Sequence, residues 1–152
     1  MNSELLVAFI SAMPVLELRF AVPYGVSQLH LPFVNVYIAA VLGNIAAGLA
    51  LLFALPYIER TAERFFPRFH VWMQSHFAKA RYKFSHRYAG LGAFALLIMT
   101  SMPLPIIGGA WTAAVVAHVL GLPKKYSVLS IVGGVILMGL FVSMATIGYG
   151  RI

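Results

Sequence analysis

Three long stretches of this 152-residue chain contain no charged side chain, and they constrain its fold more than any other feature. They are residues 20–58, 88–123 and 126–150. Each exceeds the roughly 20 apolar residues that a helix needs to cross a hydrocarbon core of about 30 Å. Charged residues make up 10% of the chain, against about 25% in a soluble domain. The sequence therefore predicts an all-α integral membrane protein in a cell membrane. The alternative, a soluble protein with an apolar core, would leave these stretches without a polar face.

Two regions of the chain resemble each other at a nearly constant offset. Ser-Ala-Met-Pro at 11–14 corresponds to Thr-Ser-Met-Pro at 100–103, and Leu31-Pro32 corresponds to Leu122-Pro123. The offset stays between 89 and 91 residues. This indicates an internal duplication, and weak internal symmetry of this kind is common in transporters.

Each repeat ends in one long uninterrupted apolar segment. The segments Phe33–Tyr57 and Tyr126–Tyr149 would each be roughly 36 Å long as helices, which is enough to cross a membrane with some tilt. We expect a single membrane domain over 1–152, in which repeat one covers 1–57 and repeat two covers 89–152.

The apolar stretch before each long segment is interrupted. In repeat two, Ala89–Met102 is roughly 21 Å long as a helix and therefore too short to cross. Pro103 and Pro105 end this helix, because proline lacks an N–H and restricts the residue before it. Gly108 and Gly109 then permit the chain to reverse. We expect a short returning helix to follow, over 110–121.

Repeat one has the same order, with a short helix at 2–13, a break at Pro14–Pro23 and a short helix at 24–31. We interpret both interrupted stretches as re-entrant helical hairpins. The alternative is one kinked span in each repeat. With one full crossing per repeat, the repeats have opposite orientations in the membrane, and their hairpins meet near the midplane. The predicted fold is thus an inverted repeat of a re-entrant hairpin plus one transmembrane helix.

The segment 58–88 between the repeats is predicted to be a basic amphipathic helix. Its aromatic and apolar residues recur at helical spacing, and its basic residues occupy other faces. Such a helix lies in the membrane interface and binds anionic lipids, and the positive-inside tendency places it in the cytoplasm. These features account for the net charge of +7, so membrane lipids are expected as partners and nucleic acid is not.

No pattern in the sequence indicates an enzyme, a metal or a cofactor. His70, His76 and His86 lack the i, i+4 spacing of a zinc-binding helix. The chain has no cysteine and no aspartate. Paired carboxylates, a P-loop and a nucleophile elbow are also missing from the sequence. We therefore expect a non-enzymatic protein that uses no cofactor.

Glu17 and Arg19 are the most informative residues, because they are the only charges between Glu4 and Glu59. A charge at membrane depth costs about 2.5–3.5 kcal/mol on insertion scales, so such groups are few and functional. They lie in the break Pro14–Pro23, and irregular backbone at that depth is tolerated only where protein or water satisfies it. The break therefore predicts a polar cavity.

The second break adds the start of a helix to this cavity. Free N–H groups at Gly108, Gly109 and Trp111 would attract an anion, and Arg19 offers a planar fork suited to phosphate or carboxylate. Glu17 is placed to bind and release a proton. The hypothesis is an anionic headgroup bound at the midplane, with proton coupling through Glu17.

Structural alternatives exist for each of these residues. Glu17 and Arg19 can form an ion pair that only closes the hairpin, and Trp111 and Thr112 can only pack its tip. Asn44 lies in the long segment of repeat one, where it either faces the site or cross-links helices. Faces of small residues on both long segments favour close packing, within the chain or in a homodimer.

The site segments also resemble a known family. Met13-Pro14-Val15-Leu16-Glu17-Leu18-Arg19-Phe20-Ala21-Val22-Pro23-Tyr24-Gly25 and Pro103-Leu104-Pro105 through Gly109-Ala110-Trp111-Thr112 are similar to the signature segments of the small multi-drug export protein family. The similarity covers essentially the whole chain, and the family's name implies export of drugs.

This family in turn resembles the DedA/VTT membrane proteins. That wider group is associated with paired re-entrant loops and with transport of polyprenyl phosphates or scrambling of phospholipids. The resemblance implies that Glu17 and Arg19 are the functional acid and base of the first loop. The chain departs from the DedA pattern in the second loop, since it has no arginine between Arg87 and Lys124.

Three functions follow from these observations. The first is a transporter or flippase for an anionic amphiphile, such as a lipid-linked phosphate or a phospholipid. The second is efflux of small amphipathic cations, and the third is a non-transporting membrane scaffold. Because two full spans enclose little space, we expect a homodimer.

Overall fold

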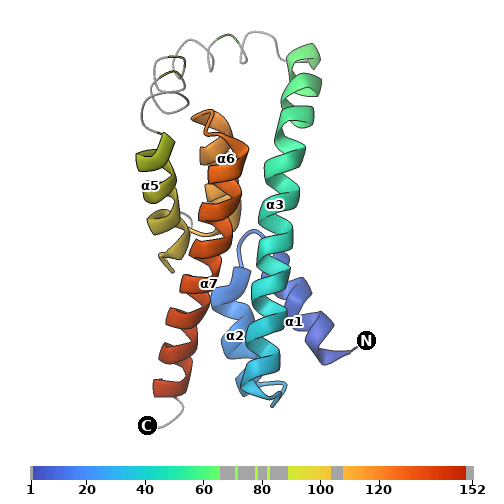
Figure 1. The fold of residues 1–152 in the computed structure, drawn as a ribbon. Coiled ribbons are helices and arrows are strands. Elements are labelled where there is room, and N and C mark those ends of the chain that lie inside the picture. Colours follow the sequence, from blue (N-terminus) through green and yellow to red (C-terminus); the bar gives the residue numbers. More distant parts are fainter. Residues whose placement is uncertain are drawn as a thin grey trace.

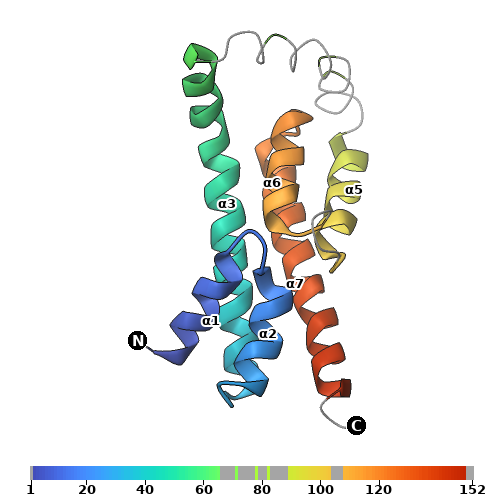
Figure 2. The same ribbon diagram turned by 180° about the vertical axis from the view of Figure 1, so that it is seen from behind.

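The computed structural model describes residues 2–65, 71, 78, 82, 89–103 and 108–149, and no strand occurs among them. These described residues form two pairs of short helices and two long ones, arranged as Figures 1 and 2 show. The helices are α1 (Ser3–Ala12), α2 (Glu17–Ser27), α3 (Phe33–Phe65), α5 (Ala89–Ser101), α6 (Ala110–Val119) and α7 (Lys124–Tyr149).

The long helices α3 and α7 run antiparallel to each other (Figure 1). Lys124, at the start of α7, places its Nζ 5.3 Å from the ring centre of Phe53 in the second half of α3. Near the start of α3, the Tyr37 hydroxyl donates to the carbonyl of Ile136, midway along α7, at 3.3 Å. Both helices are long and apolar enough to cross a membrane, as the sequence predicts.

Each pair of short helices lies beside the first half of one long helix. Figures 1 and 2 show α1 and α2 beside the start of α3, and α5 and α6 beside the start of α7. We call the end where α3 finishes and α5 begins the linker end, and the end where α3 begins and α7 finishes the opposite end. The tips of the two pairs meet halfway between these ends (Figure 1).

Small residues let the first helix of each pair approach its long helix. A Cβ at Gly43 of α3 would collide with the backbone of Ala8 in α1. A Cβ at Gly134 of α7 would collide with Thr100 of α5. Ser11 of α1 also donates a 2.6 Å hydrogen bond to the carbonyl of Ala40 in α3. Close backbone approach of this kind is how helices associate in lipid, where the hydrophobic effect between them is weak.

Most helix boundaries lie within a few residues of the predicted ones, but the prediction of an irregular break over Pro14–Pro23 is wrong. The irregular backbone covers only 13–16, and α2 begins at Glu17 and contains Pro23. Proline removes one backbone hydrogen bond, and here the fully buried Leu18, Ala21 and Val22 hold the helix against its neighbours. Packing therefore outweighs the local preference of proline.

The end of the first long segment also differs from the prediction. The helix α3 continues past Tyr57 to Phe65, so the first part of the expected linker extends this helix. Nearly all of the predicted amphipathic stripe between 66 and 88 lies outside the described residues.

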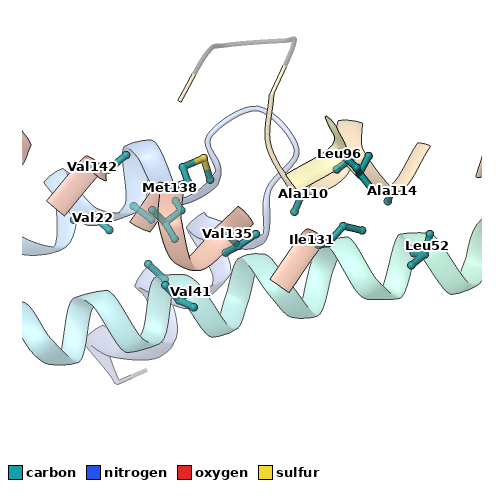
Figure 3. Packing of buried hydrophobic residues seen from close by; sticks show 14 of the residues in the cluster. Val22, Val41, Leu52, Leu96, Ala110, Ala114, Ile131, Val135, Met138 and Val142 are labelled. Carbon is teal, nitrogen blue, oxygen red and sulfur yellow. The ribbon is translucent and has the colours of Figure 1, made fainter. Parts of the chain in front are cut away.

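The buried core runs along α7 between the two pairs of short helices. Figure 3 shows Val22 and Val142 at one end of this cluster, and Leu96 and Ala114 at the other. Large apolar side chains also cover much of the outer surface; they include Leu5, Phe9, Leu42, Leu91, Phe94, Leu129, Phe141 and Met144. An apolar exterior of this extent matches a protein surrounded by lipid.

Candidate functional site

The site forms where the tips of the two helix pairs meet. The indole Nε1 of Trp111, in the first turn of α6, donates a 3.0 Å hydrogen bond to the carbonyl of Ala12, the last residue of α1. A helix leaves its last carbonyls without intrahelical partners, so Trp111 satisfies a group that the end of α1 exposes. The tip of the α5–α6 pair thus supplies a hydrogen-bond donor to the tip of the α1–α2 pair.

Replacing Trp111 with Phe tests this contact. The substitution keeps an aromatic ring but leaves the carbonyl of Ala12 without the indole donor. We expect a destabilisation of about 1 kcal/mol, the typical net contribution of one hydrogen bond. The measurement is the midpoint of thermal unfolding in an uncharged detergent. Trp72→Phe, in the segment between the repeats, is the matched control, and an equal effect of both substitutions would contradict the assigned contact.

Glu17 is the first residue of α2, and its side chain is buried, with 1% exposed. Its carboxylate accepts a hydrogen bond from the backbone N–H of Trp111, which is one of the free donors at the start of α6. Its backbone has φ 46°, a left-handed conformation that costs a residue other than glycine about 1–3 kcal/mol. The surrounding contacts hold Glu17 in this conformation.

Gly109 provides the space for this carboxylate. Its φ is 103° and its ψ is 175°, a backbone conformation that is essentially restricted to glycine. A Cβ at this position would collide with the Glu17 carboxylate. The glycine is therefore required both for its backbone angles and for its missing side chain.

These contacts correct one expectation. The sequence predicts that the start of α6, around Gly108, Gly109 and Trp111, is free to hold an anion. In the structure, Glu17 occupies this position, because the positive end of the helix and its free N–H groups stabilise a nearby carboxylate. The protein's own acid fills the predicted anion site.

Arg19 connects the acid to the second tip. Its Nη2 lies 3.1 Å from Oε2 of Glu17 and also donates to the carbonyl of Gly108, at 3.3 Å. The Arg19 side chain is 16% exposed, and its Nε and Nη1 are buried without a hydrogen-bond partner among the described residues. Since a guanidinium offers five N–H donors, Arg19 retains donors for a further group.

Two clefts adjoin Arg19. Cleft 1 has a volume of about 420 Å³ and is lined by Pro14, Val15, Arg19, Leu51, Gly108, Trp111, Thr112 and Val115. Cleft 2 has a volume of about 440 Å³ and is lined by Arg19, Pro23, Ser27, Pro103, Phe141, Val142, Ala145 and Thr146. Both are mainly apolar, and both volumes are within the range of small-molecule sites.

The tertiary structure thus brings together most of the residues that the sequence indicates. Pro14, Gly108, Trp111 and Thr112 line the first cleft with Arg19, and Pro23 and Pro103 line the second. The carboxylate of Glu17 and Gly109 lie against each other at the start of α6. Neither residue is among those that line the two clefts. Pro105 lies outside the described residues.

Asn44 lies on α3 and is completely buried. Neither its Oδ1 nor its Nδ2 has a hydrogen-bond partner in the described part of the chain. It lies one helical turn from Ala40, whose carbonyl binds Ser11, and one turn from Gly48, which packs against Ala110. This face of α3 meets both tips, so Asn44 belongs to the surroundings of the site.

One polar contact near the site is missed by the sequence reasoning. His118, near the end of α6, pairs with Glu59 of α3, with 2.8 Å between Nε2 and Oε2. These residues are 59 positions apart and belong to no motif. The position of His118 matches neither the spacing of a metal site nor that of a catalytic site, so no sequence signal identifies its partner.

The fold and this site together define a small helical membrane protein with an ion pair between apolar clefts. The sequence profile of the small multi-drug export protein family matches residues 17–141. The chain therefore belongs to this family, and the match begins at Glu17 and includes Arg19 and the second tip. No curated protein and no solved structure matches the chain significantly. The wider similarity to the DedA/VTT proteins stays a prediction.

Proposed function

We propose that this protein exports an amphiphile with an anionic group, such as a carboxylate or a phosphate, across the membrane. The observation that carries the proposal is the position of Arg19. Arg19 lines two apolar clefts, and its buried Nε and Nη1 have no hydrogen-bond partner among the described residues. An apolar cleft with one fixed polar group suits a ligand with an apolar body and a charged head, and the family's name supports export.

The arrangement in the membrane is part of this proposal. The helices α3 and α7 cross the bilayer in opposite directions, and the α1–α2 and α5–α6 pairs enter from opposite faces as re-entrant hairpins. The two repeats are then inverted relative to each other, which is a common architecture of transporters with a midplane site. The basic segment 58–88 faces the cytoplasm, and a homodimer stays a prediction.

The partners of the two charges favour an anion over a cation. The Glu17 carboxylate is buried and already binds Arg19 and the N–H of Trp111. Arg19, in contrast, lines both clefts, and its buried Nε and Nη1 lack a partner within the described part of the chain. A cationic ligand would meet the guanidinium first and be repelled by it.

Glu17 gives the proposal a route to proton coupling. A substrate anion that binds Arg19 competes with the carboxylate of Glu17 for the same guanidinium. Protonation of Glu17 removes this competition, because the neutral acid no longer attracts Arg19. Binding of the anion and binding of a proton would then favour each other.

The test uses Trp111 as a reporter, since it lines cleft 1. The chain has two tryptophans, so a Trp72→Phe variant leaves Trp111 as the only indole. This variant, in vesicles of neutral phosphatidylcholine, is titrated with dodecyl phosphate and with dodecyltrimethylammonium. We expect Trp111 fluorescence to respond to dodecyl phosphate at concentrations at least about tenfold lower, which corresponds to about 1.4 kcal/mol.

The matched variant is Arg19→Lys, which keeps the charge but loses the planar fork. We expect it to weaken binding of dodecyl phosphate by about tenfold, because hydrogen bonds to charged groups contribute about 1.5–3 kcal/mol. Binding of dodecyltrimethylammonium should not change. Tighter binding of the ammonium compound would instead support efflux of cations. Binding of neither compound would support the scaffold function.

A further inference from the structure

Arg19 is the one residue that the two clefts have in common among those lining them in the described part of the chain. Cleft 1 is lined mainly by the first turns of α6 and by the connection between α1 and α2, with Leu51 of α3, and cleft 2 mainly by α2 and α7. Arg19, whose guanidinium is bonded to Glu17 and to the carbonyl of Gly108, therefore borders two separate clefts.

Cleft 1 extends from the tips toward the linker end. Trp111, Thr112 and Val115 lie along the first turns of α6, which runs from the tip to the linker end (Figure 1). The end of α6 is level with the late part of α3, because His118 pairs there with Glu59.

Cleft 2 extends from the tips toward the opposite end. Its lining residue Ser27 is the last residue of α2. A Cβ at the nearby Gly25 would meet Val36, close to the start of α3, which places the end of α2 at the opposite end of the molecule. The residues of α7 that line this cleft, from Phe141 to Thr146, belong to the last third of that helix, which finishes at the same end (Figure 1).

The pair of Glu59 and His118 lies beyond cleft 1 on the linker side. Trp111, Val115 and His118 are spaced i, i+4, i+7 and so share one face of α6. On α3, Glu59 lies eight residues after Leu51, or roughly 12 Å further toward the linker end. The pair therefore joins α6, which lines cleft 1, to α3, which contributes Leu51 to it, at a position further toward the linker end.

We infer that clefts 1 and 2 are the two halves of one path across the protein, divided by Arg19, and that the Glu59–His118 pair closes the linker-side half. The inference rests on the proposed export function. A ligand would enter one half, reach Arg19, and leave through the other half after the tips separate. A structure with one closed pair and one divided path fits a resting state of such a cycle.

The chain has no cysteine, so single cysteines can report access to each half. Thr112→Cys probes cleft 1 and Thr146→Cys probes cleft 2, and both replace threonine in a helix. The reagent is a membrane-impermeant maleimide, applied separately to each face of sealed vesicles that contain the full-length protein. We expect Thr112→Cys to react only from the linker side and Thr146→Cys only from the other side.

The closing pair is tested on the same reporters. We expect His118→Ala to raise the labelling rate of Thr112→Cys at least fivefold and to leave that of Thr146→Cys unchanged. Glu59→Ala removes the other partner and should have the same effect. The matched control is Asn35→Ala, which breaks the 2.6 Å hydrogen bond between Asn35 and Glu4 at the opposite end and should leave cleft 1 unaffected.

Labelling of both cysteines from one side, or of neither from any side, would overturn the divided path. Unchanged labelling of Thr112→Cys in both His118→Ala and Glu59→Ala would overturn the role of the pair. These outcomes differ from a failure of the proposed substrate class. If dodecyl phosphate does not bind but the cysteines react from opposite faces, the path stands and the anionic ligand is wrong.

Discussion

Replacing Gly109 with Ala is expected to destabilise the protein by about 3–5 kcal/mol. Two costs contribute to this value. The backbone at Gly109, with φ 103° and ψ 175°, costs a residue with a Cβ about 1–3 kcal/mol. The new Cβ also displaces the Glu17 carboxylate from the N–H of Trp111, and a hydrogen bond to a charged group contributes about 1.5–3 kcal/mol. Because native proteins are stable by only about 5–15 kcal/mol, much of the protein should fail to fold.

The measurement is the midpoint of thermal unfolding in an uncharged detergent. Gly90→Ala is the matched control, since a Cβ there would meet no atom within 4 Å. It should stabilise α5 by up to about 1 kcal/mol, because alanine is the better helix former. If both substitutions have similar effects, the assigned role of Gly109 is wrong.

A double substitution separates the two costs at Gly109. Glu17→Ala removes the carboxylate that a Cβ at 109 would strike. In the Glu17→Ala background, Gly109→Ala should therefore cost only its backbone part, about 1–3 kcal/mol. Residues in direct contact give non-additive effects of this kind. Additive effects would show that the carboxylate does not occupy the space beside Gly109.

Replacing Arg19 with Leu is expected to destabilise the protein by a similar amount, about 3–5 kcal/mol. The substitution leaves Glu17, with 1% of its side chain exposed, as a buried charge without its partner. Removing one member of a buried ion pair typically has this effect. The same unfolding experiment measures it.

The variant Glu17→Gln/Arg19→Leu distinguishes a buried charge from lost packing. Glutamine keeps an oxygen that can accept from the N–H of Trp111, but it carries no charge. We expect the double variant to be more stable than Arg19→Leu alone by at least about 2 kcal/mol, because the unpaired charge is gone. A double variant that is less stable than the single one would contradict a charge-based explanation.

The sequence predicts where the helices are, because membrane and helix physics act locally. Long uncharged stretches lack a polar face for water and therefore indicate helices in lipid, and the start of α5 and the proline after its end lie where the spacing predicts them. Glu17 and Arg19 are identified because charges are rare at membrane depth. Pro23 is the instructive exception, since local preference predicts a break and buried neighbours keep a helix.

The sequence by itself determined that this chain is a helical membrane protein with one acid and one base between its first apolar segments, since the cost of burying charge and backbone depends on composition and order alone. Only the tertiary structure decided what those charges touch. It places the carboxylate of Glu17 against Gly109, which lies at the start of α6 and about 90 residues further along the chain, and it places Arg19 in the lining of two clefts. It also pairs Glu59 with His118. Contacts between segments about 60 to 90 residues apart depend on how helices pack, and no local pattern encodes them.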